Sequence, residues 1–212
     1  MEITASIAKD VASTLLDIEA IKLSPEVPFT WASGWKSPIY FDNRMLLSFP
    51  AAREKVALTM SQFIKEKYPN VQLIAGVATG AIGMGMLVAD RLGLPFVYVR
   101  PEPKKHGRGN QIEGSFTEGE KTVVIEDLIS TGMSSIGAVK ALRENHLDVL
   151  GMVAIFSYLF EVAQHNFSSA AIGLDTLSQY NALLEETKER NYISQAQLET
   201  LAKWRLAPDK WT

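Results

Sequence analysis

Short apolar runs alternate with helical patterns between residues 71 and 160, and this alternation constrains the fold more than any other feature of the sequence. Each run is apolar along most of its length, which is typical of strands that are buried on both faces of a parallel sheet. The expected strands are 71–78, 94–100, 121–127 and 147–160, with 170–175 as a further candidate, and the expected helices between them are 81–93 and 133–145. The sequence therefore predicts an α/β fold in which helices flank a mostly parallel, twisted sheet.

The residues outside this alternation predict a small N-terminal hood and a helical C-terminal tail. Apolar residues recur at helical spacing near the N-terminus, and Pro50 is well placed in the first turn of a second helix. Between these helices, Pro, Gly and Ser residues interrupt any helical pattern. The expected elements are helices over 5–21 and 50–68, a short strand at 39–41, and a helical tail over 176–211.

Length and composition limit the classes of protein to which the chain could belong. At 212 residues we expect one domain over 1–212, with 1–45 contributing the hood. The net charge of −3 gives no general attraction to nucleic acid or to an anionic membrane, so we expect neither as a partner. There is no cysteine, no signal-peptide pattern at the N-terminus, and no apolar run close to the roughly 18 residues of a membrane span. We therefore expect a cytoplasmic protein.

Three polar or glycine-rich segments follow the predicted strands: 76–85, 100–114 and 126–135. In open α/β sheets, ligands bind beyond the carboxyl ends of the strands. We therefore expect these three segments to form one site.

The segment 126–135 begins with two acids and continues with a turn of small residues that leads into a helix. Free N–H groups, hydroxyls and the helix dipole can bind a phosphate at such a turn, although most turns of this kind are only helix caps. Glu126 and Asp127 end an apolar strand, where neighbouring side chains point to opposite faces, and a buried carboxylate there needs a polar partner. A sugar phosphate would satisfy both features, because its hydroxyls suit the acids and its phosphate suits the turn.

The segment 100–114 is basic although the whole chain is acidic. Over 100–109, Arg100, Lys104, Lys105 and Arg108 against Glu102 give a local charge of +3. Prolines and glycines prevent a regular helix, so the segment is either a solvated loop or a lid that closes over a polyanion. His106 is the one lid group whose unperturbed pKa is near neutrality.

Two further segments are weaker candidates. The turn at 78–81 could form an anion-binding nest for a diphosphate, or it could be small only for packing. In the hood, Lys36 and the aromatic residues Phe29, Trp31 and Tyr40 could bind a planar acidic substrate, although such aromatics are usually core residues.

Together these motifs resemble the type I phosphoribosyltransferases, and within that family the branch that uses orotate. The stretch 123–135 is similar to the family's phosphoribosyl-pyrophosphate motif, 29–44 to the N-terminal signature of the orotate branch, and 100–109 to its catalytic loop. The resemblance implies transfer of a phosphoribosyl group from phosphoribosyl pyrophosphate to orotate, in pyrimidine nucleotide synthesis.

The resemblance also implies roles for individual residues. Glu126 and Asp127 would bind the ribose hydroxyls, 130–134 the 5-phosphate, with Ser130 also near orotate, and 78–81 the pyrophosphate. The implied catalytic residues are Lys104, Arg100, His106 and Asp127. The implied substrate-binding residues are Lys36, Arg100, Lys104, Lys105, His106, Glu126, Asp127, Leu128, Ile129, Ser130, Thr131, Gly132, Met133 and Ser134. Mg²⁺ would be held mainly through the substrate rather than by protein ligands, and the protein would be a homodimer with shared active sites.

The chain departs from the family pattern at three positions. Some members have a lysine where this chain has Ala32, a basic residue where it has Pro101, and an Asp-Arg pair where 156–161 read FSYLFE. These departures leave open which group holds the orotate carboxylate. A purine-type phosphoribosyltransferase and a non-catalytic regulator that binds phosphoribosyl pyrophosphate are the alternative functions.

Overall fold

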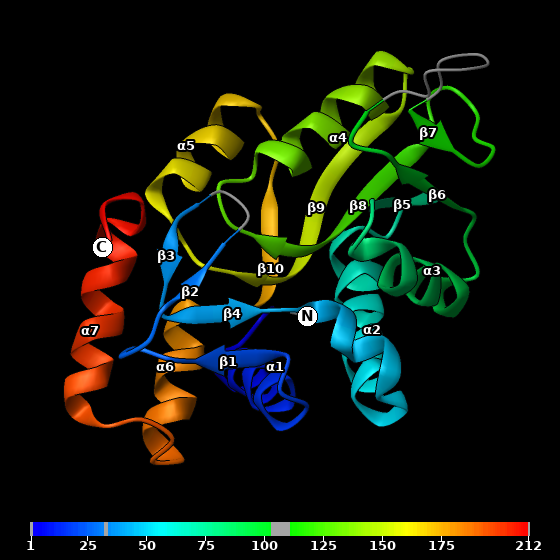
Figure 1. Cartoon of the computed structure of the whole chain (residues 1–212). Coiled ribbons are helices and arrows are strands. Elements are labelled where there is room, and N and C mark those ends of the chain that lie inside the picture. Colours follow the sequence, from blue (N-terminus) through cyan, green and yellow to red (C-terminus); the bar gives the residue numbers. More distant parts are fainter. Residues whose placement is uncertain (1, 32–33, 103–110, 212) are drawn as a thin grey trace.

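A six-stranded sheet forms the centre of the molecule (Figure 1). The computed structural model describes residues 2–31, 34–102 and 111–211. Five strands of the sheet are parallel, and β7 at one edge is antiparallel to β6. In spatial order the strands are β10 (Leu174–Gln179), β9 (Asp148–Ser157), β8 (Lys121–Ile129), β5 (Leu73–Val77), β6 (Phe96–Val99) and β7 (Ile112–Glu113). The predicted α/β class with a mostly parallel sheet is confirmed.

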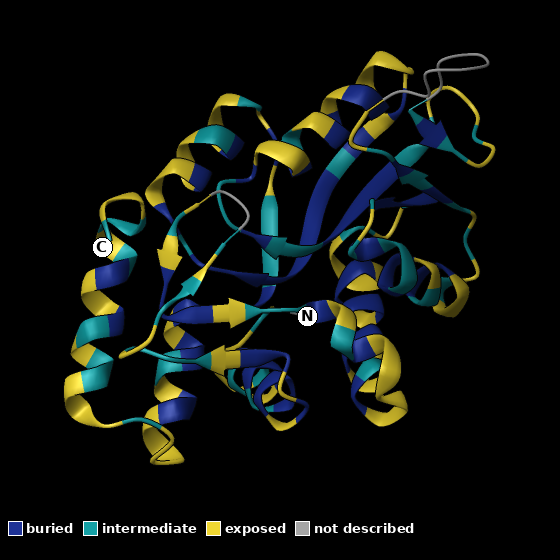
Figure 2. Cartoon of the chain, viewed as in Figure 1, coloured by how far each residue is buried: buried dark blue, intermediate teal, exposed yellow. Residues whose placement is uncertain are grey.

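Helices cover both faces of this sheet, and each face has its own apolar core. Along β8, Val123 and Ile125 belong to one core and Val124 to the other, because successive side chains of a strand point to opposite faces. Figure 2 shows the resulting pattern of buried central strands and helices that are exposed only on their outer sides. The first core lies under α1 (Ala5–Asp17), α2 (Pro50–Lys67), α3 (Ala81–Leu92) and α6 (Tyr180–Glu189), and the second lies under α4 (Met133–Glu144) and α5 (Glu161–Ser169).

The hood consists of two small antiparallel pairs beside the sheet. In the first pair, β1 (Ile21–Leu23) lies against β4 (Ile39–Phe41), and in the second, β2 (Phe29–Thr30) lies against β3 (Lys36–Ser37). A 3-10 helix, η1 (Asn43–Ser48), then leads into α2. The C-terminal helix α7 (Gln195–Leu206) and the short η2 (Pro208–Lys210) complete the chain.

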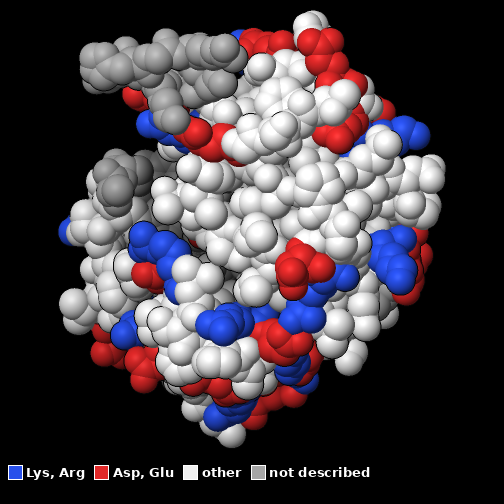
Figure 3. Space-filling view, turned by 90° about the vertical axis from the view of Figure 1, so that its right-hand side faces the viewer, with Lys and Arg blue, Asp and Glu red and all other residues white. Residues whose placement is uncertain are grey.

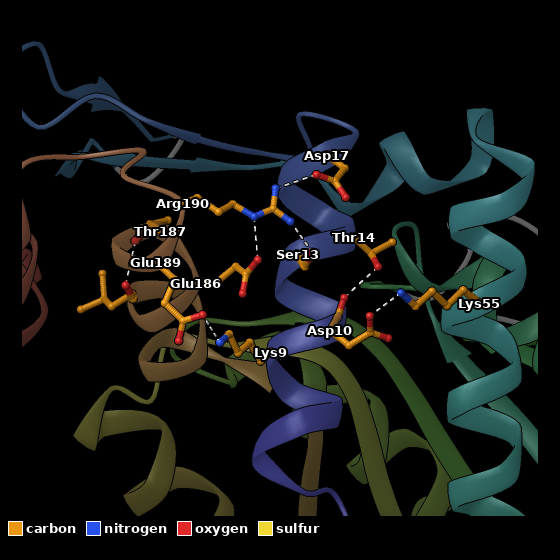
Figure 4. Close-up of polar contacts among 11 residues, drawn as sticks. Lys9, Asp10, Ser13, Thr14, Asp17, Lys55, Glu186, Thr187, Glu189 and Arg190 are labelled. Atoms are coloured by element: carbon orange, nitrogen blue, oxygen red, sulfur yellow. Dashed lines mark hydrogen bonds and ion pairs between the residues drawn. The ribbon is translucent and has the colours of Figure 1, made fainter.

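Polar contacts attach the first helix to its neighbours (Figure 4). The guanidinium of Arg190 on α6 donates to Asp17, Ser13 and Glu186, and so links α6 to α1. On the other side of α1, Lys55 Nζ of α2 lies 2.5 Å from Asp10 Oδ1. Exposed ion pairs of this kind stabilise a fold only slightly, so α1 is held mainly by its buried apolar face, which includes Val11 and Leu15.

Several predicted boundaries were wrong. The first helix ends at Asp17 rather than at residue 21, because Glu19 adopts a positive φ of 55° and Ile21 pairs with Phe41 in the hood. The strand expected at 170–175 begins only at Leu174, where pairing with β9 starts, and extends into the predicted helical tail. Helix α5 was not predicted, although Ala163 and Phe167 are buried one helical turn apart. None of the helices in the described part of the chain is long and apolar enough to span a membrane.

Candidate active site

The segments that follow β5, β6 and β8 lie together at the edge of the sheet that is formed by the carboxyl ends of its parallel strands, because these three strands are parallel neighbours. Backbone hydrogen bonds extend this arrangement beyond the strands: Ala78 N donates to Val99 O at 2.9 Å, and Arg100 N donates to Gln111 O at 2.9 Å. The predicted convergence of the three segments is therefore present among the described residues.

Glu126 is buried at this edge, on the face that α4 covers. Its side chain accepts two hydrogen bonds, from Ser135 Oγ to Oε2 at 2.7 Å and from Asp127 N to Oε1 at 3.0 Å. Burial, and then the neighbouring Asp127 carboxylate, raise the pKa of Glu126 well above its ordinary value. A carboxyl group in this environment is held in one orientation beneath the first turn of α4.

Asp127 points to the opposite face and is partly exposed. Its carboxylate lies against the backbone of Gly80 at the start of α3, where an added Cβ would be 2.0 Å from Asp127 Oδ2. Asn43 of η1 fixes the backbone, since its Nδ2 donates to Asp127 O at 2.5 Å. Glu126 therefore contacts α4 and Asp127 contacts the start of α3, on different faces of the sheet as the strand periodicity predicted, while their carboxyl groups remain neighbours.

The turn after β8 places backbone N–H groups at the start of α4. Gly132 has a φ of 77°, and a Cβ there would be 2.6 Å from the ring of Phe167, so only glycine fits. Asn166 Nδ2 of α5 donates to Thr131 O at 3.0 Å and so supports the turn. Because the first N–H groups of a helix have no intrahelical partner, this turn is suited to an anion.

The predicted substrate-binding residues around the turn differ in exposure. Met133 and Ser134 are exposed, while Ser130 and Leu128 are partly exposed and line a cavity. Ile129 differs from the others, because its side chain is buried in the core under α4 and α5. It would contact a ligand only through its backbone.

A cavity of about 240 Å³ connects the hood to the turn. It is lined by aromatic rings together with Thr30 of the hood and Ser130 of the turn, which both carry small hydroxyl side chains. Lys36 is exposed on β3, and its Nζ donates to Thr30 Oγ1 at 2.8 Å. The complete lining is Thr30, Trp31, Tyr40, Phe41, Leu128, Ser130 and Tyr158. A flat ring with polar substituents fits this combination of surfaces.

The basic segment is only partly described. Arg100 follows β6 at the site edge, and its Nη1 lies 3.7 Å from Glu113 Oε1. Lys104, Lys105 and His106, the remaining predicted lid residues, lie outside the described residues.

Six residues at the site were not named individually from the sequence, although Gly80 and Ser135 lie in the candidate segments 78–81 and 126–135: Thr30, Phe41, Asn43, Gly80, Ser135 and Tyr158. Asn43 and Tyr158 are buried and lie within motifs that had been compared with the family. A buried polar residue beside a motif is the signal that could have identified Asn43. Nothing local distinguishes Gly80 or Ser135 from helix-start residues, because their contacts with Asp127 and Glu126 depend on the tertiary fold.

Within the described ranges, no three acidic, histidine or cysteine side chains gather into a group that could hold a metal ion. Of Glu126 and Asp127, only Asp127 has a partly exposed carboxylate; Glu126 is buried and accepts a hydrogen bond from Ser135. A metal ion at this edge would therefore need oxygen atoms from a ligand to complete its coordination.

Comparison with known proteins agrees with this geometry. Residues 43–161 match the family model described as the phosphoribosyl transferase domain. The chain is 52% identical to an orotate phosphoribosyltransferase of Cytophaga hutchinsonii over 203 residues, which are 96% of this chain and 97% of the relative. It is 50% identical to that of Porphyromonas gingivalis over 206 residues, or 97% of this chain and 98% of the relative. The crystal structure of orotate phosphoribosyltransferase from Aeropyrum pernix has a TM-score of 0.75 at 25% identity, and covers 87% of this chain and 99% of that one.

Proposed function

This chain belongs to the phosphoribosyl transferase family, and within it to the orotate phosphoribosyltransferases, and from this premise we propose how its residues carry out the reaction. The enzyme converts orotate and phosphoribosyl pyrophosphate into orotidine 5′-phosphate and pyrophosphate. The observation that carries our assignment of the site is the cavity that joins the hood to the turn after β8, because Thr30 of the hood and Ser130 of the turn both line it.

Orotate would occupy this cavity. Tyr40 and Phe41 of the hood and Tyr158 of the sheet supply apolar surface for the flat ring, and Thr30 and Ser130 supply hydrogen bonds. Lys36 is bound to Thr30 through its ammonium group, and this places a positive charge beside the cavity. We assign the orotate carboxylate to Lys36, since this chain has Ala32 where some relatives have a lysine, and FSYLFE at 156–161 where they have an Asp-Arg pair.

The phosphoribosyl group would lie between this cavity and α4. The turn 130–134 would bind the 5-phosphate through N–H groups and hydroxyls. Asp127, which is partly exposed, would accept hydrogen bonds from the ribose hydroxyls. Glu126 would hold the backbone of Asp127 in place by accepting the hydrogen bond from Asp127 N. A direct contact between Glu126 and the ribose stays a prediction.

Catalysis would consist mainly of positioning and of neutralising the leaving group. A ring nitrogen of orotate attacks the anomeric carbon, the bond to pyrophosphate breaks, and the configuration at that carbon inverts. Lys104, assisted by Arg100 and His106, would hold the pyrophosphate as negative charge develops on it. The loss of one such preorganised contact costs about 10²–10³ in rate in other enzymes.

Mg²⁺ is part of this proposal as a partner of the substrate. The described residues offer one partly exposed carboxylate at the site, so diphosphate and ribose oxygens would supply most of the coordination. When bound, the ion would offset part of the negative charge of the diphosphate.

A homodimer with shared sites also belongs to the proposal, and one face of the monomer supports it. The face that Figure 3 shows, on the side of α3, is largely uncharged across its middle. Met86 of α3 and Leu47 and Phe49 beside it are large apolar side chains that are exposed in the monomer, and Leu47 lies over Gly83 of α3. Exposed apolar groups of this size are typical of association surfaces.

We place the enzyme in the cytoplasm, where its highly charged substrates are retained.

A base-selection assay tests the function. The purified protein is incubated with phosphoribosyl pyrophosphate and, in turn, orotate, adenine, hypoxanthine, guanine and xanthine, with and without Mg²⁺, while pyrophosphate release and orotate absorbance are followed. We expect release with orotate and Mg²⁺ only. Release with a purine would indicate the purine-type alternative, and binding of phosphoribosyl pyrophosphate without release under any condition would indicate a regulator.

A further inference from the structure

The pair of strands that covers the orotate cavity is too short to hold its own position. β2 and β3 contribute two residues each, and an isolated two-stranded hairpin is at best marginally stable in water. Yet this pair carries Thr30 and Lys36, which have to keep a fixed position relative to Ser130. Thr30 lines the cavity together with Ser130, and Lys36 is bonded to Thr30. Another part of the molecule must therefore support the pair.

The support comes from the C-terminal helix, which runs beside β3 (Figure 1). Trp204 of α7 is fully buried, and its Nε1 donates to Lys36 O at 3.2 Å. Its ring meets the ring of Trp31 edge to face, at 5.7 Å between centroids and an angle of 87°. One side chain of α7 thus contacts the backbone of β3 and a lining residue of the cavity.

Trp204 also contacts a second lining residue of the same cavity. Its ring lies 5.7 Å from that of Tyr158, which follows β9 and lines the same cavity. The position of α7 is fixed independently of the hood, because Tyr180 Oη of α6 donates to Leu201 O at 2.7 Å and Arg205 Nη1 donates to Leu159 O at 3.2 Å. These bonds hold Trp204 in place between Trp31 of the hood and Tyr158, which follows β9.

We infer that Trp204 is a positioning residue for orotate, which gives the C-terminal helix a role in substrate selection. The inference rests on the proposed placement of orotate beside Lys36. Trp204 does not touch the substrate; it holds the carbonyl group of Lys36, and with it the register of β3, over the cavity. The turn 130–134 and α4 form the phosphoribosyl side of the site. Arg205 and Leu206 of α7 line a cavity with Thr131 of that turn, but Trp204 does not, so this side should not depend on Trp204.

The test is steady-state kinetics of Trp204→Phe, which keeps an aromatic ring and removes the N–H donor. We expect the KM for orotate to rise about fivefold, the equivalent of one neutral hydrogen bond, while the KM for phosphoribosyl pyrophosphate and kcat change less than about twofold. Ser178→Ala is the matched control, because it removes one buried hydrogen bond, from Ser178 Oγ of β10 to Ala8 O at 2.6 Å, that involves neither α7 nor β3. It should lower the melting temperature by a similar amount and leave the KM for orotate unchanged.

If Trp204 contributed only to the stability of the fold, the two variants would change the KM for orotate by the same factor. Equal rises in the KM for orotate would therefore overturn the inference. If Trp204→Phe does not fold, benzothienylalanine at position 204, which replaces the N–H by sulfur and keeps the shape of the indole, gives the same comparison. A wild-type protein without orotate turnover would overturn the proposed function and this inference with it. Normal wild-type turnover and an unchanged KM for orotate in the position-204 variant would overturn this inference alone.

Discussion

The carboxylate of Asp127 rests against the backbone of Gly80, so closely that a Cβ at residue 80 would lie 2.0 Å from Oδ2. The Asp127 carboxylate can thus keep this position only while residue 80 has no side chain. This contact fixes the direction of the carboxylate that we assign to the ribose hydroxyls.

Gly80→Ala should therefore displace Asp127. Overpacking of this kind costs about 1–3 kcal/mol, and we expect the KM for phosphoribosyl pyrophosphate to rise by about tenfold or more. The control is Gly137→Ala on α4, where an added Cβ meets no atom within 4 Å and should slightly stabilise the helix. Wild-type kinetics in Gly80→Ala would show that Asp127 does not bind the ribose.

The burial of Glu126 predicts a pH dependence of stability. Because the pKa of Glu126 is raised on folding, the folded protein binds more protons than the unfolded chain at pH values between the ordinary pKa of 4.5 and the raised one. In that interval the free energy of unfolding falls as the pH rises, and Glu126→Gln removes this contribution. Urea unfolding at pH 5 and pH 8 should show that the wild type loses more stability than the variant between the two values; parallel changes would contradict the prediction.

These two acids show what the sequence could and could not predict about the site. Their contacts with helices on different faces follow from the period of a strand, whereas the closeness of the two carboxyl groups, which raises the pKa of Glu126, does not. Which of the two is buried depends on what covers each face, namely Ser135 on α4 for Glu126 and Gly80 on α3 for Asp127. Such contacts join residues from different elements, and no local pattern contains them.

The fold shows the same difference between local patterns, which the sequence contains, and contacts between distant elements, which it does not. The alternating strands and helices between residues 71 and 160 were predicted because their patterns are local and strong. The end of α1 was misplaced, since Ile18 and Ile21 continue the helical spacing in the sequence, whereas in the structure Ile21 pairs with Phe41. The position of β10 is likewise set by its pairing with β9 rather than by an apolar run.

Lys36→Met tests the partner that we assign to the orotate carboxylate. Removing the ammonium group while keeping the length of the side chain should raise the KM for orotate about tenfold, as expected for a hydrogen bond to a charged group. Lys22→Met, on the neighbouring hood strand β1, is the control and should keep wild-type kinetics. An unchanged KM in Lys36→Met would mean that another group holds the carboxylate.

Met86→Glu tests the association surface on α3. A charge buried in an apolar interface without a partner is costly, so sedimentation velocity should show a dimer for the wild type and a monomer for the variant. Leu206→Glu is the control, because Leu206 is also exposed but lies on α7, on the opposite side of the molecule from α3 (Figure 1). A wild-type monomer, or a dimer that tolerates Met86→Glu, would remove the support that this face gives to the proposal.

If the loop with Lys104 serves the site of the neighbouring subunit, two inactive variants should restore each other. Lys104→Ala lacks the group assigned to the leaving pyrophosphate, and Asp127→Asn lacks the carboxylate assigned to the ribose, so each homodimer should be nearly inactive. After subunit exchange in an equal mixture, half of the dimers combine the two chains, and each of these has one site with both residues intact. Pyrophosphate release should then recover to about a quarter of the wild-type rate, as the statistics of random pairing in a twofold dimer require. If the loop acts within its own subunit, every site in the mixture lacks one of the two residues, and no activity returns.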